Sequence, residues 1–269
     1  MKNFKMKLSA VGLGSLLFLG AAQADIANSV HNLGTTGPIS GSGPVGGTER
    51  ICVFCHTPHG SDINAPVPLW NKILPASGSF QTYDTLGTAT LDAQIDLNVG
   101  GISLACLSCH DGTSALDLVL NAPTVTGGVY RYDATGTFLA GGTGAFMNGA
   151  PSPVPMLGTD LRNDHPVGVQ YAGGGLLWAD IVGANTVANS ANDKMFEEPI
   201  WNNGRLWVGS VGVTSVLGDE GLPLYGNAGN AFGPTVECAS CHNPHKTDNG
   251  SFLRRSNAGS ALCKACHIK

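Results

Sequence analysis

The cysteines carry the clearest chemical information in this chain, because all eight fall in four Cys-x-x-Cys-His runs. Two cysteines at this spacing can form thioether bonds to the two vinyl groups of one haem, and the adjacent histidine can bind the iron. We therefore predict four covalently bound haem c groups. The runs, called motifs 1 to 4 in chain order, supply the anchoring cysteines Cys52 and Cys55, Cys106 and Cys109, Cys238 and Cys241, and Cys263 and Cys266, and the proximal iron ligands His56, His110, His242 and His267.

Eight cysteines could also serve two other purposes. The thiols could form a disulfide framework, or pairs of Cys-x-x-Cys units could hold zinc. Neither use requires a histidine directly after each pair. Histidine occupies only 8 of 269 positions, so four such placements are not a chance result. The pattern favours haem attachment.

The histidine count also matches the number of distal ligands that four haems need. Neutral imidazole is a good ligand for haem iron, whereas a methionine ligand would raise the reduction potential. Methionines are available at Met147, Met156 and Met195, but the count does not require them. We expect the distal ligands to be the four remaining histidines, His31, His59, His165 and His245.

Two of these histidines stand three residues after a proximal histidine, in Cys-His-Thr-Pro-His (55–59) and Cys-His-Asn-Pro-His (241–245). Three residues span at most about 10 Å, too short a link to reach the opposite face of the same haem. His59 and His245 are therefore expected to serve neighbouring haems. Pro58 and Pro244 stiffen the two links, which favours closely packed haems in a constant geometry.

Residues 1–24 have the features of a secretory signal peptide. Three lysines precede an apolar stretch over residues 8–22, and Ala22-Gln23-Ala24 is a small-x-small cleavage pattern. The apolar stretch is shorter than the roughly 20 residues that span a bilayer, and no later segment is apolar enough to span one. We predict removal after Ala24 and export, to the extracellular space or alternatively to the periplasm.

The composition predicts few regular elements. The chain has 38 glycines and 15 prolines, only 7% aromatic residues, and no long amphipathic helical period. We expect mostly irregular loop, short helices at the Cys-His runs, a few short strands, and a core packed largely by haem.

Along the chain, the motifs form two groups around an insert. The predicted organisation is a flexible N-terminal arm (25–50), a first haem-pair region (51–120), a Gly-rich haem-free insert that carries His165 (121–236), and a second haem-pair region (237–269). The formal net charge of −5 becomes more negative when the three leader lysines are removed, which disfavours nucleic acid as a partner.

Several segments together resemble the doubled CXXCH multihaem cytochromes, most closely the OmcE-type tetrahaem cytochromes that form extracellular nanowires. The resemblance implies a multihaem cytochrome c fold with four bis-histidine, low-spin haems in a continuous stack. It also implies subunits joined head to tail, an arrangement that propagates a filament when it does not close into a ring. The segments are Ser29–Leu33, Ile51–His59, Pro68–Asn71, Asn163–Gly168, Val236–His245, Phe252–Arg254 and Ser256–Cys263.

His31 stands near the predicted mature N-terminus, on an arm with no predicted element to hold it. Together with the resemblance, this position suggests that His31 completes a haem of an adjacent subunit. The alternative is that it binds a haem of its own chain, or none.

The expected function is electron transfer without substrate chemistry, so the protein is not predicted to be an enzyme. An iron with two axial histidines has no open position for a small molecule. The expected partners are other copies of the chain, other redox proteins and extracellular acceptors. One alternative is a monomeric periplasmic or extracellular electron shuttle. A multihaem reductase is a further alternative, which would need at least one iron without a distal histidine.

Overall fold

The computed structural model describes the parts of the chain that carry all four motifs. The predicted signal peptide (1–24), His165 and much of the predicted insert lie outside the described residues. Every structural statement below refers to the described residues, which are 26–34, 36–37, 48–86, 98–113, 116, 118–121, 156–164, 167–174, 196–197, 199–202, 205–209, 221–226 and 234–268.

The helices are short, and each motif coincides with one of them. Motif 1 lies at the 3-10 turn η2 (Cys52–Phe54), motif 2 in α2 (Gly101–His110), motif 3 in α4 (Cys238–Cys241) and motif 4 in α5 (Ala261–Lys264). The prediction of short helices at the Cys-His runs is confirmed. Helical geometry suits the motif because residues three apart lie on the same side of a helix. The other 3-10 turns are η3 (Ser77–Ser79), η4 (Tyr83–Leu86), η5 (Leu161–Asn163), η6 (Tyr171–Gly174) and η7 (Ala258–Ser260).

The longest described helix, α2, is buried around most of its circumference. Gly100 enters it in an extended conformation, and the amide of Asp111 donates to the carbonyl of Leu107 at its end. Leu107, Ser103 and Ser108 are fully buried, each with 0% of its surface exposed. A helix that is buried on several sides lies inside a structure and not at its surface. Accordingly, α2 packs against α4, so motifs 2 and 3 meet at the centre.

The strands form two small antiparallel sheets, as the prediction of a few short strands requires. In one, β1 (Val169–Gln170) pairs with β5 (Thr235–Val236), which leads directly into α4. In the other, β3 (Arg205–Val208) lies between β2 (Ile200–Asn202) and β4 (Leu222–Pro223). Pro223 lies on an edge strand, where its missing amide hydrogen leaves no pairing bond unmade.

The buried apolar residues are divided among three clusters, and each contacts anchoring cysteines. The first contains Leu33, Phe54 and Leu116 with Cys55 and Cys109 packed against it. The second is built on Phe80, Val99, Leu104, Leu107, Leu161 and Val167, with Cys238 beside it. The third is built on Tyr171, Ala172, Leu206, Val208 and Leu224, with Cys266 beside it. The anchoring cysteines therefore lie at the edges of separate small clusters. This position is compatible with the prediction that haem groups fill the rest of the core.

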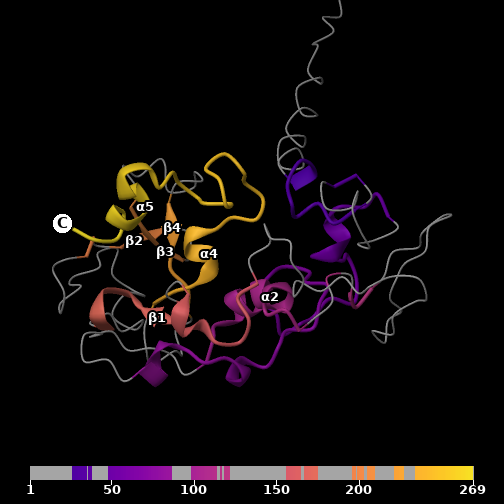
Figure 1. Ribbon diagram of the computed structural model, residues 1–269, viewed down its shortest axis with the longest axis horizontal. Coiled ribbons are helices and arrows are strands. Elements are labelled where there is room, and N and C mark those ends of the chain that lie inside the picture. Colours follow the sequence, from indigo (N-terminus) through magenta and orange to yellow (C-terminus); the bar gives the residue numbers. More distant parts are fainter. Residues whose placement is uncertain are drawn as a thin grey trace, which may run out of the picture.

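Figure 1 shows how these parts are arranged. The helices α2 and α4 lie near the centre, the β2–β4 sheet and α5 lie toward the C-terminal end, and the indigo segment that contains motif 1 lies on the opposite side of α2. None of the described helices is both long and apolar enough to cross a membrane.

Candidate haem sites

The thiols of all eight cysteines are free of disulfide bonds. Burial raises the pKa of Cys55 to about 12 and that of Cys266 to about 12. A thiolate ligand for zinc requires deprotonation, which such burial opposes, whereas a thioether carries no charge. Among the described residues, no three His, Cys, Asp or Glu side chains cluster as a metal site would require. These thiols therefore fit thioether attachment better than metal binding.

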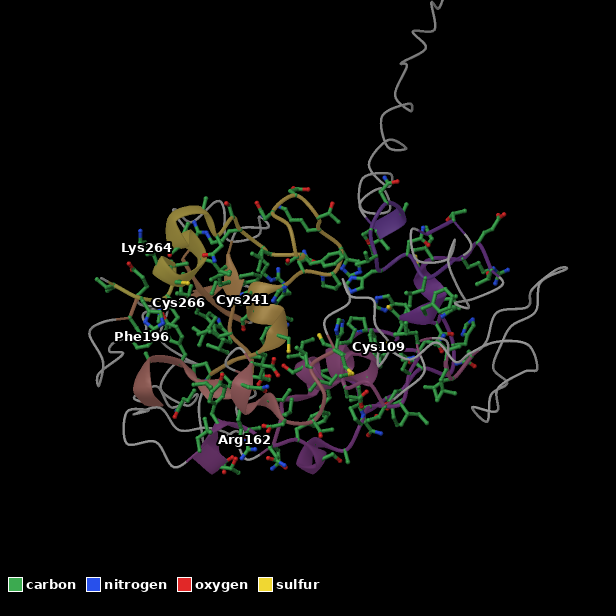
Figure 2. All side chains as sticks on the ribbon, viewed as in Figure 1. Cys109, Arg162, Phe196, Cys241, Lys264 and Cys266 are labelled. Carbon is green, nitrogen blue, oxygen red and sulfur yellow. The ribbon has the colours of Figure 1, made fainter. Side chains whose placement is uncertain are left out.

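The motifs follow one another in space in the order of the chain. Cys55 of motif 1 and Cys109 of motif 2 pack against the same apolar cluster. A hydrogen bond between the side chains of Cys106 and Cys238 raises the pKa of Cys106 and lowers that of Cys238, which links motif 2 to motif 3. Burial raises the pKa of Cys241, with further contributions from Cys238 and from Cys263 of motif 4. Figure 2 shows Cys109, Cys241 and Cys266 spread across the molecule in this order.

Motif 1 is followed by a chain reversal that returns to it, here called the N-terminal hairpin (Cys52–Asn71). The amide of Thr57 donates to the carbonyl of Leu69 at 2.8 Å, and the amide of Asn71 donates to that of Cys55 at 2.9 Å. Between these bonds, His56 and Trp70 form an antiparallel bridge. The returning strand therefore holds the proximal histidine of motif 1 by its backbone.

Motif 3 is followed by the same arrangement, here called the C-terminal hairpin (Cys238–Arg254). The amide of Asn243 donates to the carbonyl of Phe252 at 2.7 Å, and the amide of Arg254 donates to that of Cys241 at 2.8 Å. His242 and Leu253 form the bridge. The two hairpins are thus a structural repeat. Only the Cys-x-x-Cys-His-x-Pro-His halves are alike in sequence, so the repeat does not extend to the residues of the returning strands.

The repeat orients the proximal imidazoles for iron binding. His56 Nδ1 lies 2.8 Å from the carbonyl oxygen of Pro68, and His242 Nδ1 lies 2.8 Å from that of Ser251. A carbonyl can only accept, so Nδ1 carries the hydrogen in this contact and Nε2 keeps its lone pair. A metal-binding histidine usually donates its other ring N–H in this way. Both residues therefore fit their predicted role as haem ligands.

Motifs 2 and 4 use other supports. In motif 2, His110 ends α2, and its carbonyl accepts a hydrogen bond from Leu157 at 2.8 Å. In motif 4, the amide of Glu197 donates to the carbonyl of Cys266 at 2.9 Å. The ring of Phe196 lies 4.5 Å from that of His267, and Figure 2 shows Phe196 close to Cys266. Phe196 is a supporting residue that no sequence pattern had indicated.

Two histidine pairs have the separation expected for opposite ligands of one iron. A ring nitrogen lies about 1.1 Å from the ring centroid and about 2.0 Å from a bound metal, so two axial imidazoles have centroids about 6.2 Å apart. The ring centroids of His56 and His245 are 6.1 Å apart, with an interplanar angle of 16°. His245 thus faces the proximal ligand of motif 1, not that of its own motif, as the short link predicts.

The second pair joins the N-terminal arm to motif 2. The ring centroids of His31 and His110 are 6.3 Å apart, with an interplanar angle of 87°. Burial, followed by the charge of His110, lowers the pKa of His31 to about 4, which keeps the imidazole neutral, as a ligand must be. This placement favours ligation within the same chain over the expectation that His31 reaches an adjacent subunit.

Two buried polar atoms beside these pairs have no hydrogen-bond partner: His31 Nδ1 and Trp70 Nε1. Buried polar groups are normally satisfied, so such atoms indicate a missing neighbour. The Trp70 ring lies 6.0 Å from the ring of His56. A nitrogen of His31 can bind iron, and the indole N–H of Trp70 can donate to a haem carboxylate. The residues at motifs 1 and 2 therefore fit haem.

The remaining predicted distal ligands are not placed in such a pair. His59 is exposed, and among the described residues no ring lies against its imidazole. Its carbonyl accepts hydrogen bonds from the Thr57 hydroxyl at 2.9 Å and from the Asn121 amide group at 3.0 Å, which hold the backbone but not the ring. His165 lies outside the described residues. The structure thus brings two of the four predicted distal histidines, His31 and His245, next to a predicted proximal histidine.

This arrangement defines the class of site as c-type haem attachment. The family model described as "Doubled CXXCH motif" matches residues 234–269, which contain motifs 3 and 4. The match supports a multihaem cytochrome c-type family, with covalently bound haem c and electron transport as the class of function. No curated protein gave a significant match to the chain.

Proposed function

We propose that the protein is a tetrahaem c-type cytochrome that transfers electrons along a row of bis-histidine haems. The observation that carries the proposal is the spacing of the histidine rings, 6.1 Å for His56 and His245 and 6.3 Å for His31 and His110. Motifs 1 to 4 also follow one another in space, which supports a row of haems. Motifs 1 and 2 lie outside the segment that matches the family model, so four haems are part of the proposal.

The residues divide into three roles. Bound haem c supplies one-electron chemistry between ferric and ferrous iron. The cysteine pairs hold each haem edge, the proximal histidines bind from one side, and the backbone carbonyls of Pro68 and Ser251 orient two of these histidines. His245 and His31 close the opposite side in motifs 1 and 2, so a small molecule could reach the metal only by displacing an imidazole. We propose that His59 and His165 complete the other two haems, and that the protein is not an enzyme.

The proposed setting is outside the cell, after export directed by residues 1–24. Subunits would join head to tail into a conductive filament that passes respiratory electrons to other redox proteins or extracellular acceptors. The similarity of the segments between Ser29 and Cys263 to OmcE-type cytochromes supports this part of the proposal.

Haem number and ligation can be tested on the native protein. Intact mass and haem quantification are expected to give four haems per chain, and electron paramagnetic resonance only low-spin ferric signals. Fewer than four haems, or a high-spin signal with cyanide binding in the native protein, would overturn the tetrahaem bis-histidine assignment.

Assembly needs a separate experiment. Electron microscopy of material secreted by the native cells is expected to show filaments, and size-exclusion chromatography is expected to show species that grow with concentration. Monomers at every concentration, with four low-spin haems, would replace the filament by the electron-shuttle alternative.

A further inference from the structure

Three charged side chains are buried near anchoring cysteines. Asp111 directly follows motif 2, and its carboxylate accepts from the amide and the hydroxyl of Thr113. The other two lie on either side of motif 2. Lys72 exposes 2% of its surface and Glu237 exposes 3%. Burying a charge is costly unless it is paired or hydrogen bonded, so a charge that is held in this way is fixed in position. A fixed charge in a region shielded from water acts on its surroundings much more strongly than an exposed one.

Lys72 lies at the contact between motifs 1 and 2. Its Nζ donates to the carbonyl oxygens of Leu116 at 3.1 Å and Leu118 at 2.7 Å. The side chain of Leu116 belongs to the cluster against which Cys55 and Cys109 pack. The residue before it in the chain, Asn71, is bonded through its amide to the carbonyl of Cys55. The ammonium group is therefore held beside the attachment points of two haems.

Glu237 lies at the contact between motifs 2 and 3. It directly precedes Cys238, and its Oε2 accepts from the hydroxyl of Ser103 at 2.5 Å. Ser103 is one turn before Cys106 on α2, and its oxygen accepts from the amide of Cys238 at 3.0 Å. The carboxylate thus joins α2 to the start of α4.

The hydrogen bonds of Glu237 suit an ionised carboxylate. Besides Ser103, it receives hydrogen bonds from the Thr235 hydroxyl at 3.0 Å and from the backbone N–H of Ser240. These partners are donors, and donors stabilise the charged form of a carboxylate. The negative charge is therefore held at the attachment points of the second and third haems.

We propose that Lys72 and Glu237 tune the reduction potentials of the haems in opposite directions, with Lys72 raising the potentials at motifs 1 and 2 and Glu237 lowering those at motifs 2 and 3. A nearby positive charge favours ferrous iron and a nearby negative charge favours ferric iron. The two effects oppose each other at motif 2, so the potential is lowered at motif 3 and raised at motif 1. Electrons move toward the higher potential, which biases their flow from motif 3 toward motif 1. This inference rests on the proposed electron-transfer function and gives it a direction.

Redox titration of the holoprotein, followed by haem absorbance, tests the tuning. Lys72→Gln is expected to lower at least one midpoint potential, and Glu237→Gln to raise at least one, each by a tenfold change in the reduction equilibrium or about 59 mV. The charge-conserving variants Lys72→Arg and Glu237→Asp should keep potentials close to those of the native protein. Two exposed residues provide matched controls: Arg50→Gln near motif 1 and Asp248→Asn after motif 3 should cause shifts several-fold smaller.

The outcomes separate this inference from the proposed function. Two results with normally titrating haems would overturn the tuning alone. In the first, the Lys72 and Glu237 variants do not differ from the Arg50 and Asp248 controls. In the second, the potentials of the Lys72 and Glu237 variants shift in the same direction. If the native protein does not carry four haems, the proposed tetrahaem function is overturned, independently of the tuning. Haem content and the low-spin spectrum show whether each variant is intact. If a glutamine variant loses haem, Lys72→Met or Glu237→Met is titrated instead, with the same expected signs.

Discussion

The N-terminal and C-terminal hairpins have the same backbone arrangement but different surroundings. In both, a returning strand bonds the residues on either side of the proximal histidine, and a carbonyl accepts from its Nδ1. The histidine three residues later differs, because the ring of His245 lies 6.1 Å from that of His56, whereas no ring of the described residues lies against His59. The hairpin thus fixes the proximal ligand, and the packing of distant segments decides the use of the distal one.

The supports of the two hairpins also differ. Asn71, fully buried with 0% exposed, holds the N-terminal hairpin through its side chain, which bonds Val53 and Asn121. The C-terminal hairpin is held by the partly exposed Arg254, whose Nε donates to the carbonyl of Ala239 at 2.9 Å. The C-terminal hairpin also has buried side-chain bonds, but these lie at its start, where Ser103 bonds both Glu237 and Cys238.

The largest difference is expected for the two equivalent histidines. His245→Ala should remove the distal ligand of the haem at motif 1, which becomes high-spin and binds cyanide, because no imidazole then faces His56. His59→Ala should leave that haem low-spin. Electron paramagnetic resonance and cyanide titration of both variants measure this contrast. Loss of the motif 1 low-spin signal in His59→Ala, but not in His245→Ala, would reverse the ligand pairing.

The second prediction concerns His31, which lies between His110 of motif 2 and Phe252 of the C-terminal hairpin. His31→Ala should convert the haem at motif 2 to high-spin within a single chain, since His31 faces His110. Acid should release His31 only near or below its lowered pKa of about 4, where the imidazole becomes charged. Spin state is followed in dilute protein, where subunits are separated. A low-spin motif 2 haem in dilute His31→Ala protein would contradict this assignment.

A smaller effect is expected from the side chains that support the hairpins. Asn71→Ala leaves the Val53 carbonyl and the Asn121 amide without their buried partner, and should lower the free energy of unfolding by about 2–3 kcal/mol. Arg254→Lys loses the partly exposed bond from Nε to the Ala239 carbonyl, and this loss should cost about 0.5–1.5 kcal/mol. Denaturant unfolding of the two variants gives both values. Equal losses would show that the two supports are equivalent.

The smallest effect is expected at one left-handed residue in each hairpin, Leu69 and Phe252. Leu69 has φ 56° and Phe252 has φ 57°, a conformation that costs a non-glycine residue about 1 kcal/mol. Leu69 is 51% exposed, so Leu69→Gly should leave stability unchanged or raise it by up to about 1 kcal/mol. Phe252 stacks on His31 with centroids 4.1 Å apart, so Phe252→Gly should be destabilising. Thermal unfolding gives the signs, and the same sign for both would contradict this reasoning.

The local features of the sites could be predicted from the sequence. The short helices at the motifs follow from the three-residue spacing of the cysteines, and the position of His245 beside the histidine of another motif follows from the length of its link. The returning strands of the hairpins could not be predicted, because they reach the motifs through backbone bonds, which any side chain permits. Phe196, Lys72 and Glu237 were missed for a related reason, since each acts through contacts with segments distant in the chain.

The amino-acid sequence by itself determined the anchoring chemistry, because thioether attachment and proximal ligation need residues within five consecutive positions. It also supplied eight histidines, two for each of the four proposed haems. Only the tertiary structure decided which imidazoles face one another and which charges are buried beside the anchoring cysteines. Those choices depend on packing between residues as far apart as His56 and His245, and no local spacing encodes them.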